Sequence, residues 1–258
     1  MKDINDMYNY CKKEFDKLPF LYHFTTFDSL KKIIDSRSFR LTKITSNSLN
    51  DRYEKESLSD IWKEKTYIFC MTDKMSDYYW NEYAKGKKTG VCIKIDNKNF
   101  WYRNIKDDRG SYLKHKNDKI IDLDWIIYSL DGLMIIYDNV EKYSIEDEKF
   151  KNFFSECKNL CEEKKRDLYR VKHCQGYLKS SDWGVKEKEY RIRAVIKNKC
   201  KFEINGEYKN PPYEYIFIDF SNFIDNISVG FCREFIYKKE LIEICKSSNI
   251  KYFEIVDN

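Results

Sequence analysis

One of the three histidines in the chain lies in a short aromatic stretch, Leu21-Tyr22-His23-Phe24-Thr25-Thr26. Tyr, Phe and Thr favour strands, and helical periodicity begins directly after them. We therefore expect His23 near the end of a first strand, where an imidazole can hydrogen-bond to a ligand hydroxyl. A structural histidine with a satisfied hydrogen bond would have the same sequence, and both interpretations stay open.

A second group of reactive side chains lies late in the chain, in Lys-Glu-Lys-Glu-Tyr-Arg at 186–191. The two-residue period of a strand places Glu187, Glu189 and Arg191 on one face. A carboxylate there can stabilise positive charge that develops in a transition state, and Arg191 can neutralise it or hold a phosphate. A salt-bridge ladder on an edge strand would give the same pattern.

Aromatic side chains gather in a predicted helix over 77–84, where Tyr79, Trp80 and Tyr83 lie within one turn. They could form a stacking surface for a ligand, or they could be core residues. We expect His23, Cys70, Cys92 and Glu189 to converge at one cleft.

Other patterns weigh against several common chemistries. The chain contains no Gly-rich phosphate loop and no Gly-x-Ser-x-Gly elbow. Asn50, Asp51 and Glu54 could bind a metal or phosphate, or cap a helix. A zinc site from Cys157, Cys161 and the adjacent pair His173-Cys174 would have awkward ligation, so no metal cofactor is expected.

Composition limits the class of protein. The formal net charge of +5 comes from 48 basic and 43 acidic residues, which is unlike the concentrated charge of a dedicated DNA-binding protein. The nine cysteines, the polar N-terminus and the lack of a long apolar run indicate a cytoplasmic protein with reduced thiols that does not enter a membrane.

The expected helices and strands that position these residues indicate an α+β protein with a mixed or antiparallel sheet core. An N-terminal helix within 1–19 precedes a single domain over 20–258, with a central helical insertion at about 118–175. We expect strands at 21–24, 39–41, 67–71, 90–95, 189–196, 201–204, 215–220, 227–232 and 252–256. A helix that Thr26 or Asp28 can cap follows the first strand, with Leu30, Ile33 and Ile34 on one face, and a closing helix runs over 238–247.

Several of these motifs, taken in order, resemble a bacterial domain-of-unknown-function family, family 2971. Its members carry YHYTS, FNDPxE, FCxS, WxxY, GxCIxF and KEWRI, and the resemblance covers roughly residues 20–255. This sequence departs from the pattern at Leu49, Arg52 and Tyr190, which replace Phe, Pro and Trp.

The opening strand and helix also resemble the start of ADP-ribosyltransferase folds. That resemblance implies an ADP-ribosyltransferase-like fold and NAD as substrate, with His23 and Glu189 as catalytic residues. It further implies a ligand-binding set made of Tyr22, Thr25, Trp80, Tyr83 and Arg191. The protein would then be a transferase or NAD glycohydrolase, as a bacterial toxin or antiphage defence effector with a protein or nucleic-acid target. The alternative is a non-catalytic module that binds a nucleotide or nucleic acid.

Overall fold

The computed structural model describes eight segments of the 258-residue chain. These are residues 11–44, 66–97, 105–115, 125–134, 136–138, 178–180, 187–198 and 213–256.

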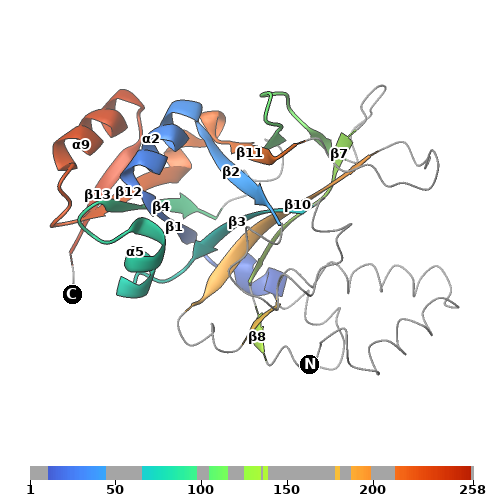
Figure 1. Cartoon of the computed structure of the whole chain (residues 1–258), viewed down its shortest axis with the longest axis horizontal. Coiled ribbons are helices and arrows are strands. Elements are labelled where there is room, and N and C mark those ends of the chain that lie inside the picture. Colours follow the sequence, from blue (N-terminus) through green and yellow to red (C-terminus); the bar gives the residue numbers. More distant parts are fainter. Residues whose placement is uncertain are drawn as a thin grey trace, which may run out of the picture.

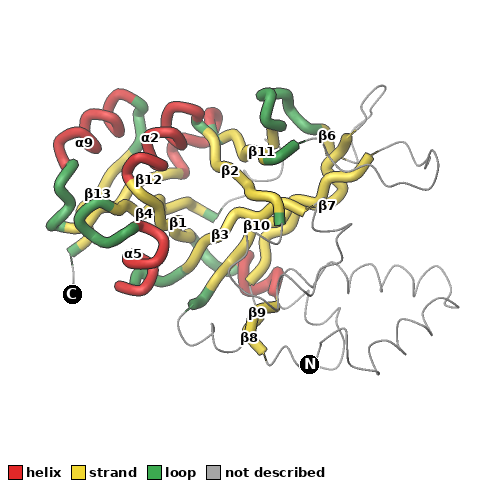
Figure 2. Tube along the Cα trace, in the orientation of Figure 1, coloured by secondary structure: helices red, strands yellow, loops and turns green. Residues whose placement is uncertain are grey.

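Strands dominate the described part of the chain (Figures 1 and 2). They are β1 (Phe20–Thr26), β2 (Ser38–Lys43), β3 (Thr66–Thr72), β4 (Gly90–Asp96), β5 (Ile105–Lys106), β6 (Lys114–His115), β7 (Trp125–Met134), β8 (Ile136–Asp138), β9 (Leu178–Ser180), β10 (Glu189–Asn198), β11 (Tyr215–Asp219), β12 (Ile227–Cys232) and β13 (Lys251–Ile255). The helices are α2 (Phe27–Ser36), α5 (Asp77–Ala84) and α9 (Lys238–Ser247), with a 3-10 helix at Ser221–Asn226 and a helical turn over residues 11–16.

Most of these strands form one open sheet. Its main path runs β13-β12-β4-β1-β3-β10-β7-β6, and β2, β11 and β5 branch from β3. The pairs are antiparallel except β12 with β13 and β6 with β7, while β8 and β9 form a separate parallel pair. The predicted α+β class, with a largely antiparallel sheet, is therefore confirmed.

Helices cover both faces of this sheet (Figure 1). Helix α2 buries Phe27, Leu30 and Ile34 in the main core, because these positions recur on one side of the helix. Helix α9 adds Leu241 and Cys245 to the same core. Helix α5 packs on the opposite face.

The prediction from sequence is wrong in one long segment. The helical insertion expected at about 118–175 is contradicted over 125–134, where the chain forms β7 and pairs with β10. Much of the remaining insertion, and the strand expected at 201–204, lie outside the described residues. None of the helices in the described segments is long and apolar enough to cross a membrane.

Candidate functional site: a fork in the sheet beside His23

The sheet forks along one edge of β3. Its other edge is paired with β10 from Thr66 to Thr72. On the forked edge, Thr72 pairs with Tyr22 of β1, whereas Ile68 pairs with Thr42 of β2. Strands β1 and β2 therefore leave β3 in different directions, and the main chain between positions 68 and 72 borders the gap.

His23 reaches into this fork from β1. Its Nδ1 atom lies 2.9 Å from the carbonyl oxygen of Cys70, midway between the two paired positions of β3. A carbonyl oxygen can only accept a hydrogen bond, so Nδ1 must carry the proton and donate it. This bond fixes both the orientation and the tautomer of the ring.

The electrostatics of the fork keep the imidazole neutral. Burial lowers the pKa of His23 below its ordinary value, and the hydrogen bond to Cys70 offsets this only in part. A neutral ring with its proton on Nδ1 has a lone pair on Nε2. His23 therefore offers one hydrogen-bond acceptor to a ligand and no charge.

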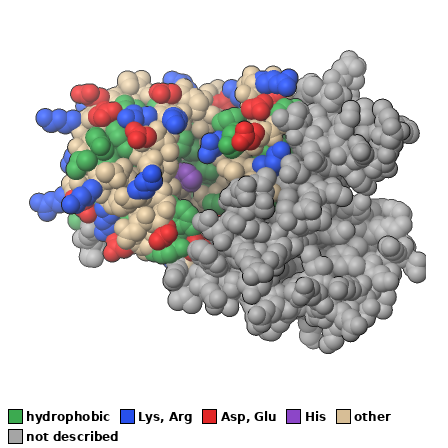
Figure 3. Space-filling view, viewed as in Figure 1, with side chains coloured by type: hydrophobic (Ala, Val, Ile, Leu, Met, Phe, Trp, Pro, Cys, Tyr) green, Lys and Arg blue, Asp and Glu red, His purple; other side chains and the backbone are tan. Residues whose placement is uncertain are grey.

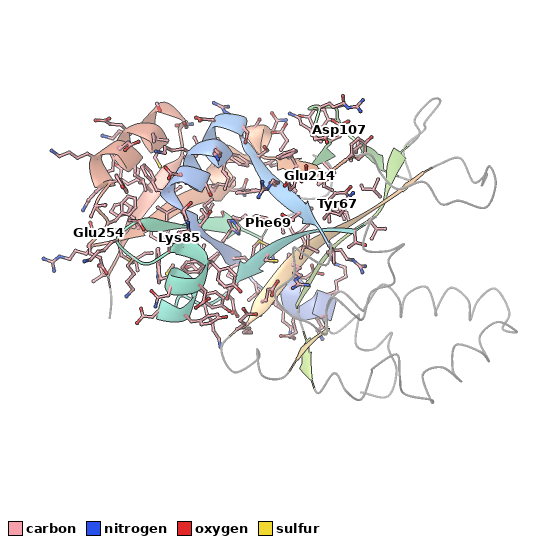
Figure 4. All side chains as sticks on the ribbon, viewed as in Figure 1. Tyr67, Phe69, Lys85, Asp107, Glu214 and Glu254 are labelled. Atoms are coloured by element: carbon pink, nitrogen blue, oxygen red, sulfur yellow. The ribbon has the colours of Figure 1, made fainter. Side chains whose placement is uncertain are left out.

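Aromatic residues form the wall of the fork. The ring centroids of Phe69 and His23 lie 4.5 Å apart, and those of Phe39 and Phe69 lie 5.0 Å apart. Figure 4 labels Phe69 and Tyr67, which lie two residues apart along β3. His23 keeps part of its surface accessible, and Figure 3 shows a histidine in a recess at the middle of the visible face.

The structure does not bring His23 and Glu189 together. Tyr22 and Glu189 each lie directly opposite Thr72, so these three side chains share one face of the sheet. The register of β1 against β4 is unbroken, so His23, the next residue after Tyr22, points to the other face. The expected cleft between His23 and Glu189 is therefore wrong.

Glu189 instead forms a buried ion pair on its own strand. The Nε atom of Arg191 donates to its Oε1 over 2.5 Å, and both residues are buried. The prediction that Glu187, Glu189 and Arg191 share one face is consistent with this pair and with the position of Glu187. That residue accepts hydrogen bonds from the hydroxyls of Tyr78 and Tyr83 of α5, at 3.0 and 2.5 Å.

The remaining predicted ligand residues divide between the two faces. Trp80 is 2% exposed and packs edge-to-face on Phe24 at 5.0 Å, so it is a core residue and not a stacking surface. Thr25 is buried on the face of His23, whereas Tyr22 is half-buried on the face of Glu189. Tyr83 keeps 39% of its surface exposed, but its hydroxyl is held by Glu187.

The predicted cysteine positions are also split. The main chain of Cys70 contacts His23, but Cys92 lies opposite Phe24 in the smaller core under α5. Residues Asn50, Asp51, Glu54, Cys157, Cys161, His173 and Cys174 lie outside the described residues. Within the described segments, no three His, Cys, Asp or Glu side chains gather as metal ligands would.

Sequence reasoning placed Cys70 near His23, but it missed the ring of Phe69 and the fact that Cys70 acts through its main-chain carbonyl. Phe69 stands inside a motif of the resemblance, but its ring was not expected beside His23. The Cys70 carbonyl is a main-chain group, so the residue type at position 70 does not indicate that it would accept this hydrogen bond. A register between β1 and β3 would have identified both, because it places position 23 beside positions 69–71.

Together these features define an α+β protein with a forked, largely antiparallel sheet and a neutral histidine in the fork. Residues 79–192 match the model of a family described as proteins of unknown function, DUF2971. This match supports the predicted family over a segment that runs from α5 into β10 and covers less than half of the chain. Comparisons with curated proteins and with solved structures give no match.

Proposed function

We propose that the chain binds a nucleotide in the fork between β1 and β2, with Nε2 of His23 accepting a hydrogen bond from a ribose hydroxyl. The observation that carries this proposal is the 2.9 Å hydrogen bond from Nδ1 to the Cys70 carbonyl. It presets the acceptor on Nε2 before any ligand arrives, so little ordering has to occur on binding.

The character of the fork selects the kind of group that it would hold. A neutral acceptor attracts a hydroxyl donor but gives no electrostatic advantage to a phosphate. The ring of Phe69 is buried and packs 4.5 Å from that of His23, so a ligand would meet the half-buried imidazole on an apolar support. A nucleoside unit supplies the hydroxyl donor for this acceptor. The resemblance to ADP-ribosyltransferases makes NAD the first nucleotide to test.

Binding without catalysis fits the geometry better than an NAD-consuming reaction. The carboxylate that the resemblance assigns to catalysis belongs to Glu189, which lies two strands from β1, roughly 10 Å between main chains. It points to the opposite face and is paired with Arg191. A carboxylate must lie beside the ribose to stabilise an oxocarbenium-like transition state.

An ADP-ribosyltransferase-like enzyme is the second proposal. The observation in its favour is the row formed by Tyr22, Thr72 and Glu189 across three adjacent strands. An active site on that face would use Glu189 without His23. Turnover of NAD that depends on Glu189 and is indifferent to His23 would support this arrangement.

Calorimetric titration with NAD, combined with detection of released nicotinamide, tests both proposals. Asparagine at position 23 can place its side-chain NH2 where Nδ1 lies, but it has no group at the position of Nε2. We therefore expect His23→Asn to lose NAD binding and Glu189→Gln to retain it, with no nicotinamide released by either variant or by the wild type. Circular dichroism melting shows that each variant is folded.

Two results would overturn the nucleotide-binding proposal. One is an absence of heat with NAD, AMP and adenosine; the other is unchanged NAD affinity in His23→Asn. Release of nicotinamide by the wild type, lost in Glu189→Gln, would replace binding by catalysis as the function.

A further inference from the structure

The face of the sheet opposite His23 is covered only in part by α5. Gly90 lies so close to Ala84 of α5 that an added Cβ would meet it at 2.4 Å, and Trp80 packs on Phe24. The helix thus covers the two rows of side chains at the Gly90 end of β4. On β1, β4, β12 and β13 the next two rows carry half-buried or exposed side chains, and we call them the open strip: Phe20, Tyr22, Lys94, Asp96, Ser228 and Lys251. Beyond β1 the row of Tyr22 continues with Thr72 and Glu189, which are buried.

The open strip combines aromatic rings with positive charge. Phe20 and Tyr22 lie two residues apart on β1, with their rings 5.4 Å apart. The Nζ atom of Lys94 lies 4.1 Å from the centre of the Phe20 ring. Lys251 stands exposed two strands away in the same row, and Asp96 is the one acidic side chain in the strip.

This composition is unusual for the solvent side of an antiparallel sheet. Along such strands, polar residues normally point to solvent and alternate with apolar residues that point to the core. The main core lies on the other face, where Leu21 and Ile93 are buried. The rings of Phe20 and Tyr22 are therefore not part of this main core; Tyr22 packs at the margin of the smaller core under α5, and both rings stay half-buried.

We propose that the open strip is a docking surface for single-stranded nucleic acid. Bases would stack on Phe20 and Tyr22, as every base presents a π-face to an aromatic side chain. Lys94 and Lys251 would meet the phosphates, to which their charge is complementary. An acidic peptide would use the lysines but would gain nothing from the rings, so nucleic acid uses the whole strip.

This surface is separate from the fork. Tyr22 and His23 are consecutive residues of β1 and point to opposite faces, so one ligand cannot contact both side chains across the sheet. The inference therefore stands or falls independently of nucleotide binding at His23.

Fluorescence anisotropy with a labelled oligothymidine of about 12 nucleotides tests the surface. We expect Tyr22→Leu to weaken binding by about 5- to 100-fold, and Tyr22→Phe, which keeps the ring, to bind like the wild type. Lys94→Gln should lower the slope of log affinity against log salt by about 0.7, the value for one phosphate contact on a single strand.

Matched controls separate the strip from general electrostatics. Lys246→Gln removes an exposed lysine from α9, on the other face, and should leave affinity and salt slope unchanged. His23→Asn should also bind the oligonucleotide normally. The proposal is overturned if the wild type does not bind oligothymidine at low salt. Equal losses in Lys246→Gln and Lys94→Gln, or preferential binding of an acidic peptide, would also overturn it.

Discussion

Substitutions at His23 should separate its structural role from its ligand role, because the two ring nitrogens have different partners. Alanine removes the hydrogen bond to Cys70, worth about 1 kcal/mol, and the contact with Phe69, worth about 0.5–1.5 kcal/mol. The free energy of unfolding should therefore fall by about 1.5–2.5 kcal/mol. For a chain of this size, that corresponds to a fall in Tm of roughly 3–10 °C.

Substitution of His23 by asparagine or glutamine should distinguish the contributions of the two ring nitrogens to this loss of stability. Asparagine keeps a donor near the position of Nδ1, so His23→Asn should retain the bond to Cys70 and lose only about 1 kcal/mol. Glutamine reaches the position of Nε2 but not that of Nδ1, so His23→Gln should be the less stable of the two. Thermal and urea unfolding measure these differences. The reasoning is refuted if His23→Asn melts as low as His23→Ala, or if neither differs from the wild type.

Three further predictions concern groups away from the fork. Burial alone would raise the pKa of Asp219, but hydrogen bonds from Lys106, Ser221 and Tyr112 lower it below its ordinary value. The Asp219 carboxylate therefore stabilises the fold above about pH 4, and this contribution is lost as the pH falls further. Asp219→Asn should lower the free energy of unfolding by about 2 kcal/mol at pH 7, and urea titrations should show the difference from wild type narrowing below pH 4. Burial and the Glu187 carboxylate raise the pKa of Tyr83, so this contribution to stability is complete below about pH 10 and is lost at higher pH. Glu187→Gln should make a tyrosine ionise earlier in an alkaline absorbance titration; an unchanged titration curve would contradict the assignment. Gly90→Ala would force a Cβ to within 2.5 Å of the main-chain oxygen of Ala84, so unfolding experiments should show a loss of about 1–3 kcal/mol, and wild-type stability would count against this packing.

Local signals in the sequence predicted many individual elements well. Helix α5 and helix α9 begin and end at the expected residues, as does strand β12. Thr26 caps α2, accepting a hydrogen bond from the main chain of Ser29. These features depend on neighbours within a few residues, so periodicity and capping preferences contain the necessary information.

Two features could not be read in this way. Ile127, Leu130 and Leu133 fit one face of a helix, but β7 forms because β10 supplies hydrogen bonds along its whole length. The alternation of Ser129 and Asp131 with Leu130 was the signal for a strand. The separation of His23 from Glu189 depends on the register between β1, β3 and β10, which is set by pairing far along the chain.

The most direct test of the central claim is the imidazole nitrogen spectrum of His23 during an NAD titration. Nitrogen-15 NMR distinguishes protonated from unprotonated ring nitrogens, and His23→Asn identifies the resonances among those of the three histidines. At pH 7 the account predicts a neutral ring with the proton on Nδ1, and a shift of the Nε2 resonance as NAD binds. A charged ring, a proton on Nε2, or an Nε2 resonance that does not move at saturating NAD would contradict it.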